Sequence, residues 1–308
     1  MYLLNNASAT TALQSLQMTQ NSLSQTQGEL SSGLAIQNAS DNSSYWSVAQ
    51  TMSSDAGALG AVTSALTSSA SMLSSFNSVI TSALSVVAKI QQDIVGAQNP
   101  GANLTQIQSD ITLQQSALVN MANDASYNGQ NWMNGTVNGS TAGYQTTASL
   151  VAGYTNQSGV SFISVNTSGV SLFTTGGTSV ATATGGILGA TSAGFSSSVL
   201  GTAAINVTGA TGASVSTLTN MLASVNNTIT SLENAASTIG SAQDQVTTQS
   251  NFASVMQTNL NNGAAAMVDA NMNQVSTRLA ALQTQQQLGV QSLAIANQSS
   301  QLVLKLFQ

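Results

Sequence analysis

The amino-acid sequence predicts a mainly α-helical protein: an elongated coiled coil or helical bundle formed by paired N- and C-terminal segments, with a small β-rich insert in the middle of the chain. Three observations predict this fold class. Apolar residues recur at helical spacing near both ends of the 308-residue chain. Long helical patterns continue inward from both ends, and a segment rich in Gly, Thr, Ser and Val separates them. Because the two outermost patterns match, the two ends are expected to pair as neighbouring helices.

Residues 8–30 carry the N-terminal pattern. Leu16, Leu23 and Leu30 are spaced by seven, Leu13 fills an alternate position, and Gln side chains occupy the polar sides. This spacing predicts a helix with a narrow apolar seam. A core-facing helix of an ordinary bundle would show the same pattern, so for this segment alone that alternative stays open.

The middle of the chain predicts three further helices. Gly33 offers a C-cap for the first helix. A helical pattern then runs over 45–98 and ends at Asn99-Pro100-Gly101, and a returning helix follows over 104–125. Helical spacing resumes over 218–260.

The insert between these helices is expected to be β-rich. Three Asn-Gly pairs predict tight hairpin-type turns: Asn128-Gly129, Asn134-Gly135 and Asn138-Gly139. Three short runs with Gly-containing turns around them predict strands: 160–165, 169–173 and 203–207. Gly176-Gly177 and Gly185-Gly186 are interpreted as turn glycines, because no phosphate-binding lysine follows them.

Residues 269–308 form the C-terminal counterpart of the first helix. Gly263 precedes this last helix, and Gly289 is its only helix-weakening residue. Its apolar positions recur at helical steps: Val275, Leu279, Leu282, Leu293 and Ala296. The segment ends in an apolar cluster: Leu302, Val303, Leu304, Leu306 and Phe307. An end with so many apolar residues needs another surface to bury it, either the other end of the chain or another copy of the protein.

This nested order predicts three domains. The expected ranges are 1–45 with 266–308 for an inner coiled-coil assembly domain, 46–138 with 216–265 for a middle helical bundle, and 139–215 for an outer β-rich variable domain.

Composition excludes several classes of protein. The chain has no Cys and no His, 4% charged residues and a formal net charge of −6. No cofactor or metal site is expected, since the usual thiolate and imidazole ligands are missing. The nine acidic residues are scattered singly, which argues against an enzyme. Three basic residues are too few to hold a nucleic acid. We also expect no membrane insertion and no cleaved signal peptide, because polar residues interrupt the apolar runs and the first residues lack a basic segment.

Two groups of residues resemble bacterial flagellins, of the alphaproteobacterial type. The N-terminal group is Ser31, Ser32, Gly33, Leu34, Asp41, Asn42, Tyr45 and Trp46. The C-terminal group lies in 269–289 and includes Arg278 and Gly289. One departure stands out, because the signature usually carries Arg after Ser-Ser-Gly-Leu and this chain has Ala35. Inter-subunit salt bridges of the usual kind are therefore not expected.

The resemblance implies a subunit of the extracellular flagellar filament, which polymerises with itself for swimming motility. It implies unfolded export without a cleaved signal peptide, and as partners the flagellar export apparatus, a chaperone, and hook-associated junction and cap proteins. The residues implied in self-assembly through the inner coiled coil are Leu13, Leu16, Leu23, Leu30, Leu279, Leu282, Leu293, Leu302, Leu304, Leu306 and Phe307. A hook–filament junction protein and a coiled-coil surface adhesin remain the alternatives.

The scarcity of charge predicts suitability for acidic surroundings. A charge-rich chain would lose its carboxylate charges below roughly pH 4 and keep its cations. This chain has three basic residues and no His, so little charge builds up in acid. High-salt adaptation is the weaker alternative, because it usually adds surface acids.

Overall fold

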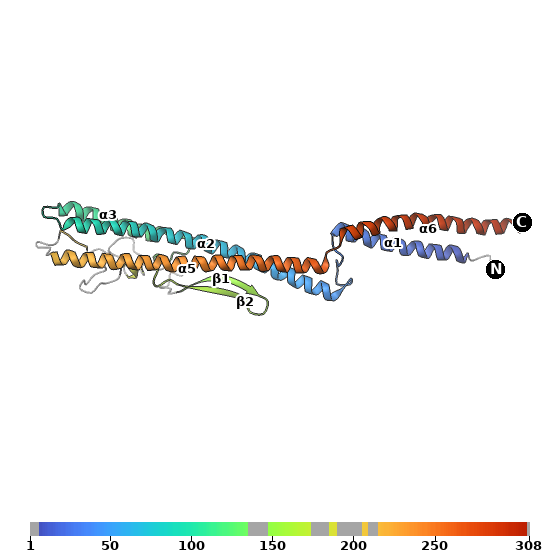
Figure 1. Ribbon diagram of the computed structural model, residues 1–308, viewed down its shortest axis with the longest axis horizontal. Coiled ribbons are helices and arrows are strands. Elements are labelled where there is room, and N and C mark those ends of the chain that lie inside the picture. The colour runs from blue at the N-terminus through green and yellow to red at the C-terminus, as the bar shows by residue number, and fades with distance from the viewer. Residues whose placement is uncertain (1–5, 135–146, 174–184, 190–204, 209–214, 307–308) are drawn as a thin grey trace. The chain divides into compact units, whose positions relative to one another are not determined.

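The computed structural model describes residues 6–134, 147–173, 185–189, 205–208 and 215–306 (Figure 1). The chain divides into two compact units. Unit 1 consists of Met1–Gly57 and Gln257–Gln308, and unit 2 consists of Ala58–Met256. Long helices with one small antiparallel sheet between them confirm the predicted fold class.

Helix α1 of unit 1 spans Ala7–Ser32, as the N-terminal pattern predicted. Asn6 caps its start, because the Asn6 side-chain oxygen accepts the Ala9 N–H at 3.1 Å. Gly33 ends it with a φ of 75°, and the Gly33 N–H donates to the Glu29 carbonyl. The C-cap predicted at Gly33 is therefore confirmed.

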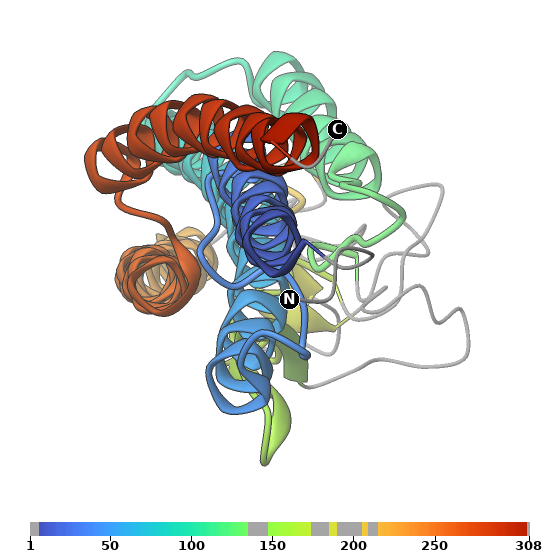
Figure 2. The same cartoon turned by 90° about the vertical axis from the view of Figure 1, so that its right-hand side faces the viewer.

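Helix α6 spans Met272–Leu306 and runs antiparallel beside α1, as both ribbon views show (Figures 1 and 2). The Asn6 side-chain amide donates to the Ala296 carbonyl at 3.0 Å near one end of the pair. At the other end, Leu34 and Asp269 form an antiparallel backbone bridge. The two ends of the chain therefore pair, as the sequence predicted.

The segment before α6 differs from the prediction. Helix α5 spans Val215–Val268, so Gly263 lies inside α5 instead of in a break before the last helix. Glycine suits this position inside the helix, because a Cβ atom here would meet the Met52 sulfur at 3.3 Å. The last helix begins only after Asp269, and the prediction of a break at Gly263 is wrong.

Unit 2 contains most of the core, on α2 (Ser43–Ala97), α3 (Leu104–Asp124) and α5. The Gln114 amide of α3 donates to the Asp93 carboxylate of α2 at 2.8 Å. The largest helix side chains that are fully buried include Leu66, Leu73, Phe76, Ile80, Ile90, Ile94, Ile111 and Leu118. Both predicted middle helices before the insert are confirmed, together with the turn at Pro100 between them.

Three large apolar residues of α3 and α5 lie outside the core. Leu113 is 67% exposed, and on α5 Phe252 and Val255 are 56% and 59% exposed. Leu113 follows Ile111 by only two positions, which turns it by about 200° around the helix.

The described part of the insert has two strands, where three had been predicted. Strands β1 (Thr147–Thr155) and β2 (Gly159–Asn166) form an antiparallel hairpin, with an irregularity in register between Val151 and Gly153. The strand predicted at 160–165 is confirmed within β2. The sequence analysis missed β1.

The strand predicted at 169–173 is wrong, because this segment is a turn followed by irregular backbone. Its apolar residues are nevertheless buried: Val170, Leu172 and Phe173. Single backbone bonds hold it, with the Phe173 N–H donating to Met133 and the Leu188 N–H donating to Leu172. Residues 205–207 are not a strand either, and 203–204 lie outside the described residues.

Two glycine-containing turns behave as predicted. Asn128 and Gly129 have φ values of 51° and 77°, and the flanking Tyr127 and Gln130 bridge each other. Gly186 opens the short helix α4 (Gly186–Gly189) with a φ of 69°. The pairs at 138–139 and 176–177, and Gly135, lie outside the described residues.

Among the described residues, α2 is long and apolar enough to cross a membrane, with a mean hydropathy of 1.3 in its most apolar window. The sequence analysis expected polar residues to interrupt all apolar stretches long enough to cross a membrane. By length and composition alone, α2 shows that this expectation is wrong. The result is weak evidence for a membrane span, since core helices of soluble proteins pass the same test. Many apolar residues of α2 are buried within unit 2.

Candidate self-assembly surface

The contact between α1 and α6 is a regular two-helix seam. The residues of α1 that lose most exposure recur at steps of three and four: Ala9, Ala12, Leu16, Thr19, Leu23, Thr26 and Leu30. The matching residues of α6 are Val275, Leu279, Leu282, Gln286, Gly289, Leu293 and Ala296. This alternation is the heptad pattern of a coiled coil. It contains six of the residues that the sequence had placed there: Leu16, Leu23, Leu30, Leu279, Leu282 and Leu293.

Two threonines, missed by the sequence analysis, are the most buried residues of α1. Thr19 is 6% exposed and Thr26 is 0% exposed. The Thr19 hydroxyl donates to the Ser15 carbonyl at 2.9 Å and the Thr26 hydroxyl to the Ser22 carbonyl at 2.8 Å. Each hydroxyl is thus satisfied within its own helix, which leaves its methyl group for packing. Their spacing from Leu16 and Leu23 was the signal that could have found them.

Gly289 allows the two helices to approach closely. A side chain at this position would meet the Leu16 Cδ1 atom at 3.3 Å, which is tighter than ordinary van der Waals contact. The sequence analysis had treated Gly289 as helix-weakening and as part of the C-terminal signature, without a packing role. In the structure its missing side chain makes room for Leu16.

The other predicted assembly residues do not lie in the seam, or cannot be placed. Leu13 is 46% exposed on the outer side of α1, so the prediction that it belongs to the seam is wrong. It sits between the seam positions Ala12 and Leu16. Leu302, Leu304 and Leu306 belong to the helical backbone of α6, but their side chains, like Phe307, lie outside the described residues.

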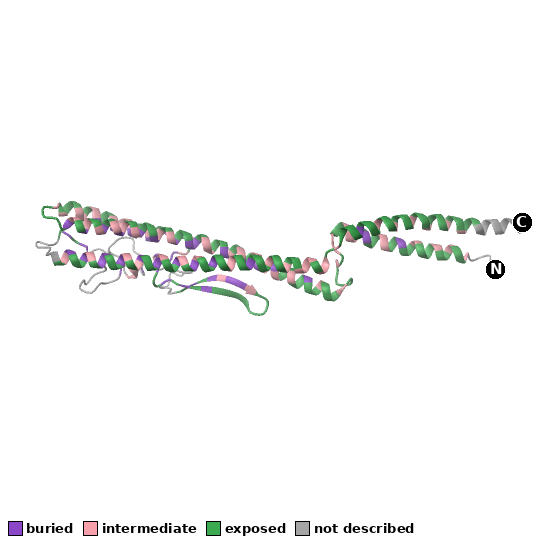
Figure 3. Cartoon of the chain, in the orientation of Figure 1, coloured by how far each residue is buried: buried purple, intermediate pink, exposed green. Residues whose placement is uncertain are grey.

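Helix α6 carries a second apolar stripe that α1 does not cover. Leu288 is 58% exposed and Ile295, seven residues later, is 66% exposed. Ala281 precedes them by the same step. We call these three residues the apolar flank of α6, and Figure 3 shows how much of α6 is exposed. A different row of the same helix is polar and also exposed: Thr284, Gln291 and Gln298. The free chain therefore leaves an apolar helix face in water.

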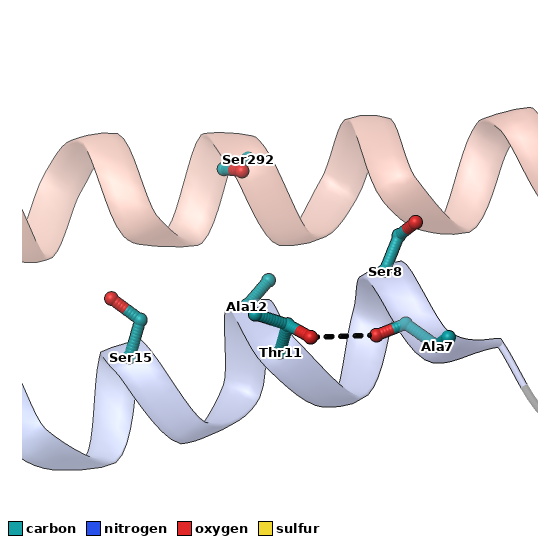
Figure 4. Close-up of a pocket in the computed structure, with 6 residues that line it drawn as sticks. All are labelled: Ala7, Ser8, Thr11, Ala12, Ser15 and Ser292. Carbon is teal, nitrogen blue, oxygen red and sulfur yellow. Dashed lines mark hydrogen bonds between the residues drawn. The ribbon is translucent and has the colours of Figure 1, made fainter.

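A shallow groove lies alongside α1 near its N-terminal end, with a volume of about 560 Å³. Small side chains line it: Ala7, Ser8, Thr11, Ala12, Ser15 and Ser292 (Figure 4). The Thr11 hydroxyl donates to the Ala7 carbonyl at 2.9 Å, so this polar group is satisfied within α1. The groove offers neither ionisable residues nor an enclosed cavity.

The signature residues near Gly33 hold the segment between α1 and α2. The Asp41 carboxylate accepts the N–H groups of Gln37 and Asn38, both at 3.0 Å. The Asn42 side-chain oxygen accepts the Tyr45 N–H at 3.2 Å and caps α2. Arg278, in contrast, lies exposed on α6.

The seam is almost free of charge. Residues 7–28 and 279–304 contain no ionisable side chain. Within the described residues, no group of three or more acidic side chains is arranged to hold a metal ion. The chemistry available on this pair of helices is apolar packing and hydrogen bonding by amides and hydroxyls.

These features define an α-helical structural protein whose two chain ends pair and still expose apolar surface. Residues 3–138 match the bacterial flagellin N-terminal helical region, and residues 222–307 match the bacterial flagellin C-terminal helical region. Flagellin C of Rhizobium meliloti (strain 1021) is 34% identical over 331 residues, which cover 99% of each chain. The flagellin of Brucella melitensis biotype 1 is 38% identical over 313 residues, again covering 99% of each. Flagellin FljM of Caulobacter vibrioides is 29% identical and covers 98% of this chain and 97% of its own.

The chain belongs to the bacterial flagellin family. It is a structural subunit of the extracellular flagellar filament and not an enzyme. The resemblance inferred from the two signatures, including the alphaproteobacterial type, is thereby confirmed.

Proposed function

We propose that the chain polymerises through its α1/α6 pair, and that the apolar flank of α6 packs against a second copy. The observation that carries this is the exposure of Leu288 and Ile295 on a helix whose other apolar stripe is already covered by α1. Covering apolar surface contributes roughly 25 cal/mol per Å². Copies of the same chain supply the missing cover.

Substitutions on two rows of α6 test this proposal. Changing Leu288 and Ile295 to Gln should abolish polymerisation, because the flank becomes polar while the seam with α1 is untouched. A matched variant on the polar row, Gln291→Ser with Gln298→Ser, should still polymerise. Sedimentation measures the polymer fraction, and circular dichroism checks helix content. Normal polymerisation of the Leu288/Ile295 variant would contradict the proposal.

The predicted assembly residues divide into two roles under this proposal. Leu16, Leu23, Leu30, Leu279, Leu282 and Leu293 hold the pair together within one chain. Leu13, exposed on the outer side of α1, is a candidate contact between copies. The terminal residues Leu302, Leu304, Leu306 and Phe307 are proposed to contribute to assembly too. Deleting residues 301–308 should abolish polymerisation, and normal filaments from that protein would contradict this role.

The inner assembly domain is proposed to comprise 1–45 and 266–308, beside a middle bundle of 46–138 and 216–265 and an outer domain of 139–215. The small residues and Gly-containing turns of 139–215 support the last assignment. Limited proteolysis of assembled filaments tests it, since the outer range should be cleaved first. Earlier cleavage in the inner ranges would contradict this division.

Export is proposed to occur without a cleaved signal peptide, through the flagellar export apparatus and with a chaperone. Hook-associated junction and cap proteins are proposed as the partners at the filament ends. Family membership supports these partners, and the absence of Cys is compatible with unfolded passage. Intact-mass measurement of filament subunits tests the first point: a mass lacking an N-terminal segment would contradict it.

The filament is further proposed to tolerate acid because it depends little on charge. Within the described residues, the carboxylates of Asp93 and Asp110 accept hydrogen bonds from the side-chain amides of Gln114 and Gln106. A carboxyl group that gains a proton keeps an oxygen that accepts such a bond, whereas an ion pair loses its Coulomb attraction. The polymer fraction at about pH 3 should stay close to that at pH 7. Dissociation in acid as complete as that of a charge-rich flagellin measured alongside would contradict this proposal.

A further inference from the structure

The seam of α1 contains an internal repeat that its partner lacks. The pattern Leu-Xaa-Xaa-Thr occurs at Leu16 and Thr19, and again one heptad later at Leu23 and Thr26. On α6, one gap without a side chain, Gly289, lies beside one polar seam residue, Gln286.

The observed pairing uses the first copy of the repeat. Leu16 lies against Gly289. Because the helices are antiparallel, counting one turn along each of them places Thr19 opposite Gln286. The seam thus has a layer in which a large side chain meets a gap, followed by a layer in which two polar side chains meet.

A slide of α6 by one heptad would reproduce both layers with the second copy. Leu23 would then meet Gly289, and Thr26 would meet Gln286. Buried polar layers normally fix the register of a coiled coil. Here the repeat means that these two layers fit either register.

Backbone hydrogen bonds at the base of the pair are compatible with the observed register only. The Ala35 N–H donates to the Val268 carbonyl at 2.7 Å, and the Ala270 N–H donates to the Gly33 carbonyl at 2.8 Å. A slide by one heptad would move the start of α6 by about 10.5 Å along the helix axis. Both bonds would break.

We propose that this backbone bridge, residues 33–36 with 268–270, selects the register of the α1/α6 pair from the two that the seam allows. The register decides which residues of α1 lie beside the apolar flank of α6, and in that respect the inference rests on the proposed mode of assembly. The bridge residues are positioning residues: they set the assembly surface without belonging to it.

Engineered disulfides read the register directly, because the chain contains no Cys of its own. The pair Ala9→Cys with Ala296→Cys reports the observed register, and Ala9→Cys with Val303→Cys reports the shifted one. Each pair is placed in the full-length chain and in a variant that lacks the two shortest of the three bridge bonds, Ala35→Pro with Ala270→Pro. The Ile36 N–H, 3.3 Å from the Val268 carbonyl, is the remaining donor. Ala39→Pro is the control, because Ala39 is the second residue of the Asn38–Asp41 turn, where proline is favoured.

The unchanged bridge and the Ala39→Pro control should give the 9–296 cross-link only. The Ala35→Pro/Ala270→Pro variant should give both cross-links, with the 9–303 product at least tenfold above its level in the control. Adding Thr26→Val should then restore the 9–296 product, since Gln286 would face an apolar side chain of equal size in the shifted register. The proposal is wrong if the bridge variant gives only the 9–296 product, if it gives neither product, or if Thr26→Val changes nothing. These cross-links form within one subunit, so they report the register even where the proposed assembly surface fails, a failure that sedimentation shows separately.

Discussion

The cores of the two units differ in kind, although both are built from long helices. In unit 2, Leu66, Phe76 and Trp132 are completely buried. Among the described side chains of the α1/α6 pair in unit 1, the buried ones are Thr19, Thr26 and Val275, and every seam leucine keeps part of its surface in water. A helix pair this short of buried apolar surface gains little from packing on itself. The contrast shows that unit 2 buries a core of large side chains within one chain and the terminal pair does not. This difference supports the proposal that other copies cover the terminal pair.

The largest effect is expected from the core of unit 2. Phe76 is fully buried, and its ring lies 5.0 Å from that of Trp132 between centroids. Phe76→Ala should therefore destabilise the free subunit by about 3–5 kcal/mol, through lost burial and a cavity. Urea unfolding followed by far-UV circular dichroism measures the change. A loss below about 1 kcal/mol would contradict the claim that unit 2 buries its own core within one chain.

An intermediate effect is expected at Gly186, where the backbone of the insert approaches closely. A side chain there would lie 2.6 Å from the Leu172 carbonyl oxygen, and the φ of 69° is itself unfavourable for other residues. Gly186→Ala should cost about 1–3 kcal/mol of unfolding free energy in the same assay. Gly240→Ala is the control, because nothing lies within 4 Å of that position. Equal stability of the two variants would show that the close approach of Gly186 to Leu172 does not contribute to the stability of the subunit.

The seam of unit 1 should respond least in the free subunit and clearly in the polymer. Leu23 is half-buried, so Leu23→Ala should change the unfolding free energy by no more than about 1 kcal/mol. The same change should lower the polymer fraction, because it loosens the helix that carries the assembly surface. Leu66→Ala should show the reverse order of effects, with about 2–5 kcal/mol lost in the subunit. If Leu23→Ala and Leu66→Ala destabilised the subunit equally, the two cores would not differ as described.

The parts that the sequence predicted well are those whose pattern is local. Heptad spacing located both terminal helices, Gly33 located the end of the first helix, and Pro100 located the turn between α2 and α3. These signals act within a few residues of the chain and need no knowledge of tertiary contacts.

The parts that it predicted poorly depend on contacts between distant residues. Gly263 breaks no helix, and Met52 packs against it. The run 169–173 is rich in apolar residues yet forms no strand, because Met133, Ile187 and Leu188 supply only a few backbone bonds and not a ladder. Thr19 and Thr26 were overlooked because a polar residue type concealed a seam position, although their spacing identified it.

Hydrogen–deuterium exchange on free subunits and on filaments tests the central claim most directly. Backbone amides in 279–298 of α6 should exchange rapidly in the free subunit and at least a hundredfold more slowly in the filament. Amides in 62–94 of α2 should exchange slowly in both, because unit 2 covers them within one chain. Strong protection of 279–298 in the free subunit, unchanged on polymerisation, would contradict the claim that other copies complete the terminal pair.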